Sequence, residues 1–180
     1  KLPDYDGIAI RSATKLTQDL IQAATRLKVI GRAGIGVDNV DIPAASKQGV
    51  IVMNAPFGNS VTTAEQTMAL MLGAARHIPA ATASTRLGKW EKNGFMGREL
   101  AGKTLGIIGT GNIGSLVIDR CKGMKMVILA YDPFISKAKA LDLGIELVEN
   151  LDDFWPRVDV LTVHAPLTPK TRHIINGDAF

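Results

Sequence analysis

Residues 104–114 read Thr-Leu-Gly-Ile-Ile-Gly-Thr-Gly-Asn-Ile-Gly, an apolar run that passes directly into a glycine-rich turn. The apolar run 104–108 predicts a buried β-strand, and apolar residues at helical spacing over 113–124 predict an amphipathic helix. A strand, the pattern Gly-x-Gly-x-x-Gly and a helix, in that order, are typical of a dinucleotide-binding turn. We therefore expect an α/β fold with a doubly wound parallel sheet of the Rossmann type.

Each glycine of the turn has its own expected role. Gly109 permits the tight turn, Gly111 lets the backbone approach a pyrophosphate because it has no Cβ, and Gly114 lets the helix pack closely. The N-terminus of the following helix offers N–H groups and a partial positive charge to phosphates. The turn is therefore predicted to cradle the phosphates of a dinucleotide.

An acidic residue follows the next predicted strand, 126–131. Asp132 lies close to the ~20-residue spacing from the turn that is typical of this fold. Its carboxylate can accept hydrogen bonds from both hydroxyls of an adenosine ribose, and it would repel the 2′-phosphate of NADP. The predicted cofactor is therefore NAD. The alternative is a purely structural turn with Asp132 as a surface residue.

A second nucleotide pattern lies just upstream, where residues 97–104 read GRELAGKT and match Gly-x-x-x-x-Gly-Lys-Thr. That loop binds triphosphates when it follows a strand and opens a helix. Here the segment after Thr104 is predicted to be a strand, so the order is wrong. We therefore reject nucleoside triphosphate binding.

Composition excludes several other classes of protein. The 180 residues carry a net charge of +4, but Lys and Arg are scattered without a dense basic run, so no nucleic-acid partner is expected. No apolar run approaches the ~20 residues of a membrane helix, and no signal peptide is apparent, so no membrane partner is expected. The single cysteine, Cys121, excludes an intrachain disulfide and favours a reducing, cytoplasmic location.

The first part of the chain predicts a separate small α/β block. Its expected strands are 6–10, 27–30 and 50–53, and its expected helices are 17–24 and 41–47. After the second strand, the loop 31–38 (GRAGIGVD) has three glycines, which let successive amides form a nest for a carboxylate. The alternative is a plain glycine-rich turn. Arg11 and Arg32 lie near strand ends, where each could pair an anionic substrate or remain a solvated surface charge.

The second part predicts a long helix and then a second α/β block. The helix has an apolar face, 61–75, and a break or end at Pro79. Ser60 or Thr62 can cap its start, and Thr62 and Glu65 have the spacing of a capping box. A second helical piece, 80–86, follows. Trp90 and Phe95 are expected to anchor the packing of an irregular segment. The remaining expected strands and helices are 136–143 (helix), 145–148 (strand), 152–155 (helical turn) and 158–164 (buried strand).

No metal site is expected. His77, His164 and His173 have no metal-ligand spacing with Cys, Asp or Glu. His164 ends a predicted strand. In one interpretation it lines a cofactor cleft, and in the other it is a core residue whose ring has its own hydrogen-bond partners.

The chain resembles the D-2-hydroxyacid dehydrogenase family. The matching stretches run almost from end to end: 11–15 (RSATK), 31–41 (GRAGIGVDNVD), 58–60, 64–65, 88–90, 95–97, 102–106, the glycine turn, 131–133 and 164–167. The resemblance implies that residues 1–54 are part of a flavodoxin-like substrate-binding domain. It implies that residues 55–180 are an NAD-binding Rossmann domain, incomplete at its C-terminal side.

The resemblance also implies particular site residues. The implied cofactor contacts are Ile35, Asn112, Ile113, Asp132, Ala165 and Pro166. The implied substrate contacts are Arg11, Arg32, Gly34 and Val37. Family members often carry Thr at the positions of Ile35 and Ala165, so hydroxyl contacts to the cofactor are lost there and main-chain contacts are expected instead.

The implied activity is hydride transfer between NAD and C2 of a small anionic 2-hydroxy or 2-oxo acid, most like the family members that oxidise 3-phospho-D-glycerate. The alternatives are a relative that acts on glyoxylate or hydroxypyruvate, and a non-catalytic NAD-binding protein resembling a transcriptional corepressor. A homodimer or homotetramer is implied, with the apolar face 61–75 and Trp90 either in the subunit contact or in the core.

No catalytic residue is assigned within the chain. The Arg, Glu and His that perform catalysis in the family are expected beyond Phe180. We therefore expect the 180 residues to be a fragment that lacks dehydrogenase turnover when purified alone.

Overall fold

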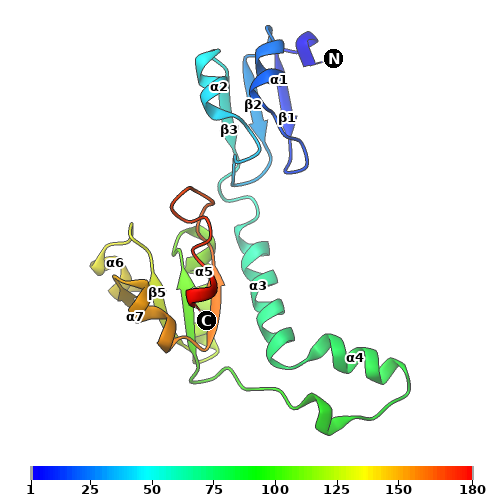
Figure 1. Ribbon diagram of the computed structural model, residues 1–180, viewed down its shortest axis with the longest axis vertical. Coiled ribbons are helices and arrows are strands. Elements are labelled where there is room, and N and C mark those ends of the chain that lie inside the picture. Colours follow the sequence, from blue (N-terminus) through cyan, green and yellow to red (C-terminus); the bar gives the residue numbers. More distant parts are fainter. Residues whose placement is uncertain (1, 180) are drawn as a thin grey trace. The chain divides into compact units, whose positions relative to one another are not determined.

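The computed structural model describes residues 2–179, apart from the side chain of Asp178. The chain divides into two compact units, Lys1–Ser60 (unit 1) and Val61–Phe180 (unit 2). Figure 1 shows the order of the helices and strands along the chain. Each unit contains its own parallel sheet, as expected of an α/β fold.

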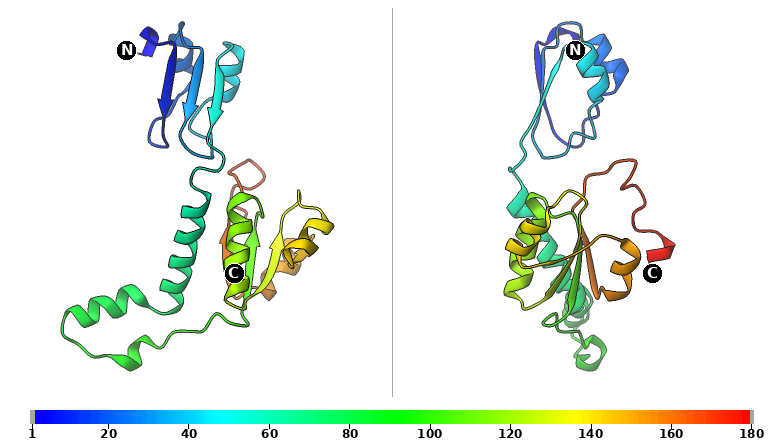
Figure 2. Two further views of the ribbon diagram at one scale, coloured as in Figure 1. Left: turned by 180° about the vertical axis from the view of Figure 1, so that it is seen from behind. Right: turned by 90° about the vertical axis from the view of Figure 1, so that its left-hand side faces the viewer.

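Unit 1 is built on three parallel strands in the order β1-β2-β3. The strands are β1 (Gly7–Ile10), β2 (Val29–Arg32) and β3 (Ile51–Asn54), and the helices are η1 (Leu2–Asp4), α1 (Gln18–Ala23) and α2 (Ile42–Lys47). Both α-helices cover the same face of the sheet (Figure 2), where Ile21 of α1 and Ala45 of α2 share a core with Ile10 and Ile30. Alternation along each strand places these residues on that one face.

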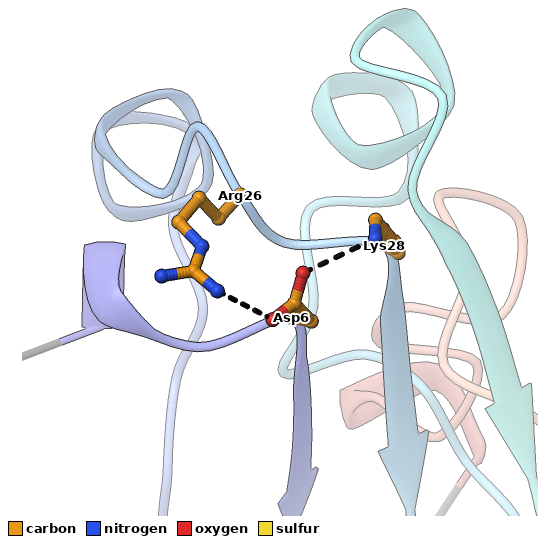
Figure 3. A network of polar contacts seen from close by, with 3 residues as sticks. All are labelled: Asp6, Arg26 and Lys28. Atoms are coloured by element: carbon orange, nitrogen blue, oxygen red, sulfur yellow. Dashed lines mark hydrogen bonds and ion pairs between the residues drawn. The ribbon is translucent and has the colours of Figure 1, made fainter.

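A surface network lies where β1 and β2 begin (Figure 3). The carboxylate of Asp6 is 2.9 Å from Arg26 Nη2 and 3.2 Å from Lys28 Nζ. Hydrogen bonds from Lys28 and then from Arg26 lower the pKa of Asp6. All three side chains are largely exposed, so this network adds little to stability. The network lies where the strands begin, whereas Arg11 and Arg32 lie where the strands end.

Unit 2 is built on four parallel strands in the order β6-β5-β4-β7. Their bounds are β4 (Thr104–Ile108), β5 (Val127–Tyr131), β6 (Glu146–Val148) and β7 (Val160–Val163). Numbered within the unit, this order is 3-2-1-4, which is the first part of the usual Rossmann order. The order in which strands are added reverses at β4: β5 and β6 lie on one side of it, and β7 lies on the other. Ligands of such sheets bind at the carboxyl ends of the strands around that point.

Helices cover both faces of the second sheet (Figure 2). On one face, α3 (Ser60–Ala75) and α5 (Asn112–Gly123) pack on β4 and β5 through residues such as Met71, Val117 and Leu105. Helix α6 (Lys137–Leu143) packs beside α5. On the other face, α7 (Leu151–Phe154) and η3 (Trp155–Arg157) bury Phe154 against Ile108 and Leu129. The short helix η4 (Gly177–Ala179) follows β7 along the chain.

Between α3 and β4, α4 (Ile78–Arg86) and η2 (Lys92–Phe95) form an arm that runs away from the sheet of unit 2 (Figure 1). The expected break near Pro79 is confirmed: α3 ends at Ala75 and Pro79 lies in the first turn of α4. The expectation that Trp90 anchors the packing is wrong, because its side chain is 85% exposed. The arm has no sheet beneath it on which an aromatic residue could pack.

Several other expectations are corrected. Strand β2 extends to Arg32, because Gly31 and Arg32 pair on both sides with β1 and β3, so the loop begins later than expected. Helix α3 already begins at Ser60, so Thr62 and Glu65 lie within it and form no capping box. Strand β7 is half-buried rather than buried, because it is one of the two edge strands of the described sheet. Of the apolar face 61–75, which was expected in the core or in a subunit contact, Ala64 is buried in unit 2 whereas Val61 and Leu72 are exposed.

Candidate functional site

Three loops meet the carboxyl edge of the unit 2 sheet, where a ligand of this fold would bind. The glycine turn follows β4, Asp132 follows β5, and His164 with Ala165 follows β7. Backbone hydrogen bonds hold them there: Gly109 N donates to Tyr131 O at 3.0 Å, and His164 N donates to Ile108 O at 2.8 Å. The structure therefore brings these predicted residues together at one edge.

The three glycines of the turn have different surroundings. Gly109 has a φ of +90°, and a Cβ there would lie 2.9 Å from Ala165 N, so this position needs glycine for both conformation and space. A Cβ on Gly114 would overlap the carbonyl oxygen of Gly109. A Cβ on Gly111 would meet nothing within 4 Å. Of the three glycines, only Gly111 therefore faces open space. A phosphate that approaches the backbone requires such a space.

The N-terminus of α5 follows the turn. Gly111 is its N-cap and, having no side chain, supplies no capping hydrogen bond to the first turn of the helix. That first turn, which begins with Asn112 and Ile113, contains no acidic residue, whereas Arg120 and Lys122 lie in the last turn. The charges therefore complement the helix dipole and leave its positive end suited to an anion.

Asp132 is tied to the turn by hydrogen bonds. Its Oδ2 accepts from both the backbone N and the Oγ1 of Thr110, each at 2.7 Å, and its Oδ1 accepts from Phe134 N at 2.9 Å. Burial raises the pKa of Asp132, but these hydrogen bonds outweigh it and hold the pKa below its ordinary value. A carboxylate has about four acceptor positions, so one on Oδ1 remains for a ligand hydroxyl.

Thr110 is a site residue that the sequence analysis did not single out. Its side chain is 7% exposed and orients Asp132, and its carbonyl oxygen accepts from Ser115 Oγ at 2.7 Å. Its position between the first two glycines was visible in the sequence. The pattern Gly-x-Gly-x-x-Gly allows any residue there, so it does not predict a hydroxyl that binds Asp132.

The segment after β7 is the third of the three loops at the carboxyl ends of these strands. Ala165 packs against the cluster that contains Ile108, and Pro166 O accepts from Thr171 Oγ1 at 2.6 Å. The half-buried His164 ring has its Nε2 3.0 Å from Thr162 Oγ1, and burial lowers its pKa. His164 thus has a partner of its own, and it also lines a groove of about 940 Å³ between α3 and β7.

The predicted substrate residues lie in unit 1, at the carboxyl ends of β1 and β2. Arg11 follows Ile10 of β1, and Arg32 ends β2. The Arg32 guanidinium lies over Gly34, where a Cβ would overlap it. The predicted cofactor contact Ile35 is also in unit 1, and its carbonyl oxygen accepts from Asn54 Nδ2 at 2.8 Å.

Asn39 is a second residue of the candidate site that was not predicted from the sequence. This side chain is 8% exposed and bonds to the Arg11 backbone and toward the Arg32 side chain. Its position inside the matching stretch 31–41 was a signal, but the burial of its amide was not visible in the sequence.

Within residues 2–179, no three His, Cys, Asp or Glu side chains are grouped as ligands of a metal ion would be. No helix in that part of the chain is both long and apolar enough to cross a bilayer.

Comparison with known proteins adds independent findings. Residues 68–180 match the family model "D-isomer specific 2-hydroxyacid dehydrogenase, NAD binding domain". Among curated proteins, the chain is 54% identical to D-3-phosphoglycerate dehydrogenase of Methanocaldococcus jannaschii over 99% of its own length and 34% of that protein. It is 48% identical to the human D-3-phosphoglycerate dehydrogenase over 100% of its own length and 34% of that protein.

Solved structures agree with the fold. D-lactate dehydrogenase from Aquifex aeolicus, complexed with NAD and lactic acid, matches with a TM-score of 0.88 and 30% identity over 99% of this chain and 53% of that one. A formate dehydrogenase from Granulicella matches with a TM-score of 0.94 and 29% identity over 99% of this chain and 49% of that one. The chain spans about a third of the length of the curated relatives that it matches. The glycine turn and Asp132 lie within the part that matches an NAD binding domain.

Proposed function

The chain belongs to the D-isomer specific 2-hydroxyacid dehydrogenase family, and from this premise we propose that the full-length protein oxidises 3-phospho-D-glycerate to 3-phosphohydroxypyruvate with NAD, for serine biosynthesis. The observation that carries the proposal is the identity of about half of all residues with D-3-phosphoglycerate dehydrogenases from an archaeon and from human, over essentially the whole chain. The glyoxylate, hydroxypyruvate and corepressor alternatives have no comparable support.

In this proposal unit 2 holds the cofactor. The open space at Gly111 and the positive end of α5 fit a pyrophosphate, and the remaining acceptor position of Asp132 fits a ribose hydroxyl. Asn112, Ile113 and Gly114 supply backbone at the phosphates, and Ala165 with Pro166 borders them. When bound, NAD supplies the acceptor for the hydride that leaves C2 of the hydroxy acid.

Unit 1 is proposed to bind the anionic substrate, in the loop that follows β2. The carbonyl of Gly34 accepts from Ala55 N at 3.0 Å and that of Ile35 accepts from Asn54 Nδ2, so both carbonyls point toward the end of β3. In trans peptides the following amides, of Ile35 and Gly36, then point away from β3. Neither amide donates to another of the residues that the structure describes. Two adjacent amides presented in this way suit a carboxylate.

Charge near the loop supports the same interpretation. Arg11 and Arg32 contribute two positive charges at this edge of the sheet, whereas the Asp38 carboxylate lies beside Gly36 and contributes one negative charge. The balance is positive, which suits a substrate that carries a carboxylate and a phosphate. Val37 follows the two amides and is proposed to border the same substrate.

Within the described residues we assign no general acid or base. His164 is bonded to Thr162, and His173 is exposed on a loop of unit 2. The proton-transfer group, with the Arg and Glu that accompany it in the family, is proposed to lie in the remainder of the full-length protein.

The test is a substrate panel with the purified full-length protein. NADH formation is measured with 3-phospho-D-glycerate, D-glycerate and D-lactate, and NADH consumption with glyoxylate and hydroxypyruvate. We expect the highest kcat/KM with 3-phospho-D-glycerate. A higher kcat/KM with another acid would assign the protein to a different branch of the family, and NAD binding without turnover of any acid would favour the corepressor-like alternative.

A homodimer or homotetramer is proposed from the arm of unit 2. Four large apolar side chains on or beside the arm are more than half exposed: Ile78, Leu87, Trp90 and Met96. Exposed large apolar side chains along one segment favour an interaction surface. Replacing Leu87 and Trp90 together by Ser should therefore shift the full-length protein toward monomers in sedimentation equilibrium, and an unchanged mass would exclude the arm from the contact.

A cytoplasmic location is proposed because the chain has a single cysteine, Cys121, and so no intrachain disulfide, which is usual in reducing compartments. Burial raises the pKa of Cys121 to about 11, so this thiol is kept protonated and unreactive within the core of unit 2. A fluorescent fusion of the full-length protein would check the location.

A further inference from the structure

We propose that Asn39 is a positioning residue that fixes Arg11 and Arg32 for the anionic substrate. The inference rests on the proposed function of unit 1 as the substrate-binding part. It goes beyond that function by assigning the placement of both arginines to one buried amide.

Asn39 closes the turn that follows β1. Residues 11–14 form this turn, in which Thr14 N donates to Arg11 O at 3.3 Å. Asn39 Nδ2 donates to Arg11 O at 2.9 Å and to Thr14 O at 2.6 Å. One amide nitrogen thus holds both ends of the turn, and the backbone from which the Arg11 side chain projects is fixed.

The same side chain contacts the second arginine. Asn39 Oδ1 accepts from Arg32 Nε at 3.4 Å, and the guanidinium of Arg32 lies over Gly34. The amide therefore links the loops that follow β1 and β2, the two loops in which the proposed substrate contacts lie. The backbone reinforces the link, because Leu16 N donates to Asn39 O at 2.8 Å and Asp41 N donates to Leu16 O at 2.9 Å.

The chemistry requires an amide at this position. Asparagine has two N–H donors and one carbonyl acceptor, and here both donors and the acceptor are engaged. An aspartate would present only acceptors to the carbonyls of Arg11 and Thr14. Thr14 O would then lose its donor and face an aspartate oxygen, and Arg11 O would keep only its bond from Thr14 N, so the turn would rearrange rather than keep its position. The side chain is 8% exposed, so water does not readily replace it.

A matched control exists in the same unit. Gln48 Nε2 donates to Ala24 O at 2.9 Å, a partly buried amide tether at the other end of the sheet, where β2 and β3 begin. Gln48→Ala removes a structural tether of the same kind without approaching Arg11 or Arg32. Its effect on thermal stability provides the baseline for a role that is only structural.

The experiment compares wild type, Asn39→Asp, Asn39→Ala and Gln48→Ala as full-length enzymes. For both Asn39 variants we expect the KM for 3-phospho-D-glycerate to rise at least about tenfold, the loss of ~1.4 kcal/mol of binding energy. We expect kcat to change by less than about threefold and the Kd for NAD to stay within about twofold, because unit 2 is untouched. Gln48→Ala should lower the melting temperature and leave the KM unchanged. An unchanged KM in the Asn39 variants, or an equal rise in Gln48→Ala, would overturn the inference.

Hydrogen exchange separates this inference from the proposed function. Amide exchange in residues 12–16 should accelerate in Asn39→Ala and not in Gln48→Ala, whatever the substrate is. If wild type does not oxidise 3-phospho-D-glycerate but the exchange accelerates, the proposed function fails and the tether stands. If exchange in 12–16 keeps its wild-type rate, the tether itself is contradicted.

Discussion

At the residue scale, the three glycines of the turn meet two different requirements, one imposed by the fold and one by a bound ligand. The pattern Gly-x-Gly-x-x-Gly does not distinguish them. Gly109 and Gly114 are required by the fold, since a Cβ at either would meet backbone atoms of the turn or of the segment after β7. Gly111 is not required by packing, because a Cβ there meets nothing. Its absence of a side chain is therefore best explained by a ligand that approaches the backbone.

This distinction predicts that Gly111→Ala weakens NAD binding without unfolding the protein. We expect at least about a tenfold rise in the Kd for NAD, or ~1.4 kcal/mol, from the methyl group in the phosphate space. Stability should fall by less than about 1 kcal/mol, the difference between Gly and Ala at an N-cap. The measurements are calorimetric titration with NAD and urea unfolding.

The control is Gly123→Ala at the other end of α5, where a Cβ also meets nothing within 4 Å. It should leave the Kd unchanged and raise stability by up to about 1 kcal/mol. Equal Kd values for Gly111→Ala and Gly123→Ala would show that the turn does not hold the phosphates.

The hydrogen bonds to Asp132 predict a pH dependence of stability. The folded pKa lies below the unfolded value of about 4, so the carboxylate stabilises the fold fully above about pH 4 and loses this effect as the pH falls through the folded pKa. Asp132→Asn should therefore be less stable than wild type at pH 7, by about 1 kcal/mol, and the gap should close in acid. Urea unfolding from pH 7 down to about pH 2.5 measures it.

The exposed carboxyl of Asp142 on α6 provides the comparison. Asp142→Asn should leave the free energy of unfolding within about 0.5 kcal/mol of wild type at neutral pH. A gap for Asp132→Asn that persists unchanged in acid would refute the assigned role of the Asp132 charge.

At the element scale, the helix caps of unit 1 differ although both N-cap residues, Thr17 and Asp41, are of types that cap helices. Asp41 Oδ1 accepts from Ala44 N at 2.9 Å at the start of α2. Thr17 occupies the N-cap of α1 but makes no side-chain capping bond there. The first cap therefore contributes a hydrogen bond to helix stability and the second does not.

From this difference, Asp41→Ala should lower the free energy of unfolding by about 1 kcal/mol, as loss of an N-cap typically does. Thr17→Ala should change it by less than about 0.5 kcal/mol, because no capping bond is lost. Urea denaturation followed by circular dichroism measures both. Equal losses would contradict the difference between the two caps.

The elements also show what the sequence predicts and what it does not. The glycine turn, its flanking strand and helix, and Asp132 were predicted because strand, turn and helix signals agree there and depend on neighbours along the chain. Trp90 was misassigned because burial depends on what lies opposite a segment, which local sequence does not contain. Thr110 and Asn39 were missed because their partners are 22 and 28 residues away. The position of Ile35 relative to the turn is left as a prediction.

At the scale of the whole molecule, the chain divides its proposed chemistry between its two units. Unit 1 presents two arginines and two amides that donate to no other described residue, all at the carboxyl ends of its strands. Unit 2 presents the glycine turn and Asp132 at the carboxyl ends of its own strands. Parallel sheets place their loops for binding at these ends. The assignment of unit 1 to the substrate and unit 2 to the cofactor is therefore consistent with one rule of α/β architecture.

The most direct test is to compare binding of NAD and NADP to the full-length protein by isothermal titration calorimetry, with wild type and Asp132→Asn. We predict that wild type binds NAD at least about tenfold more tightly than NADP, because the ionised Asp132 repels the 2′-phosphate. We predict that Asp132→Asn narrows this ratio. Equal affinity of wild type for the two cofactors, or no binding of NAD, would contradict the assignment of the turn and Asp132 as the NAD site.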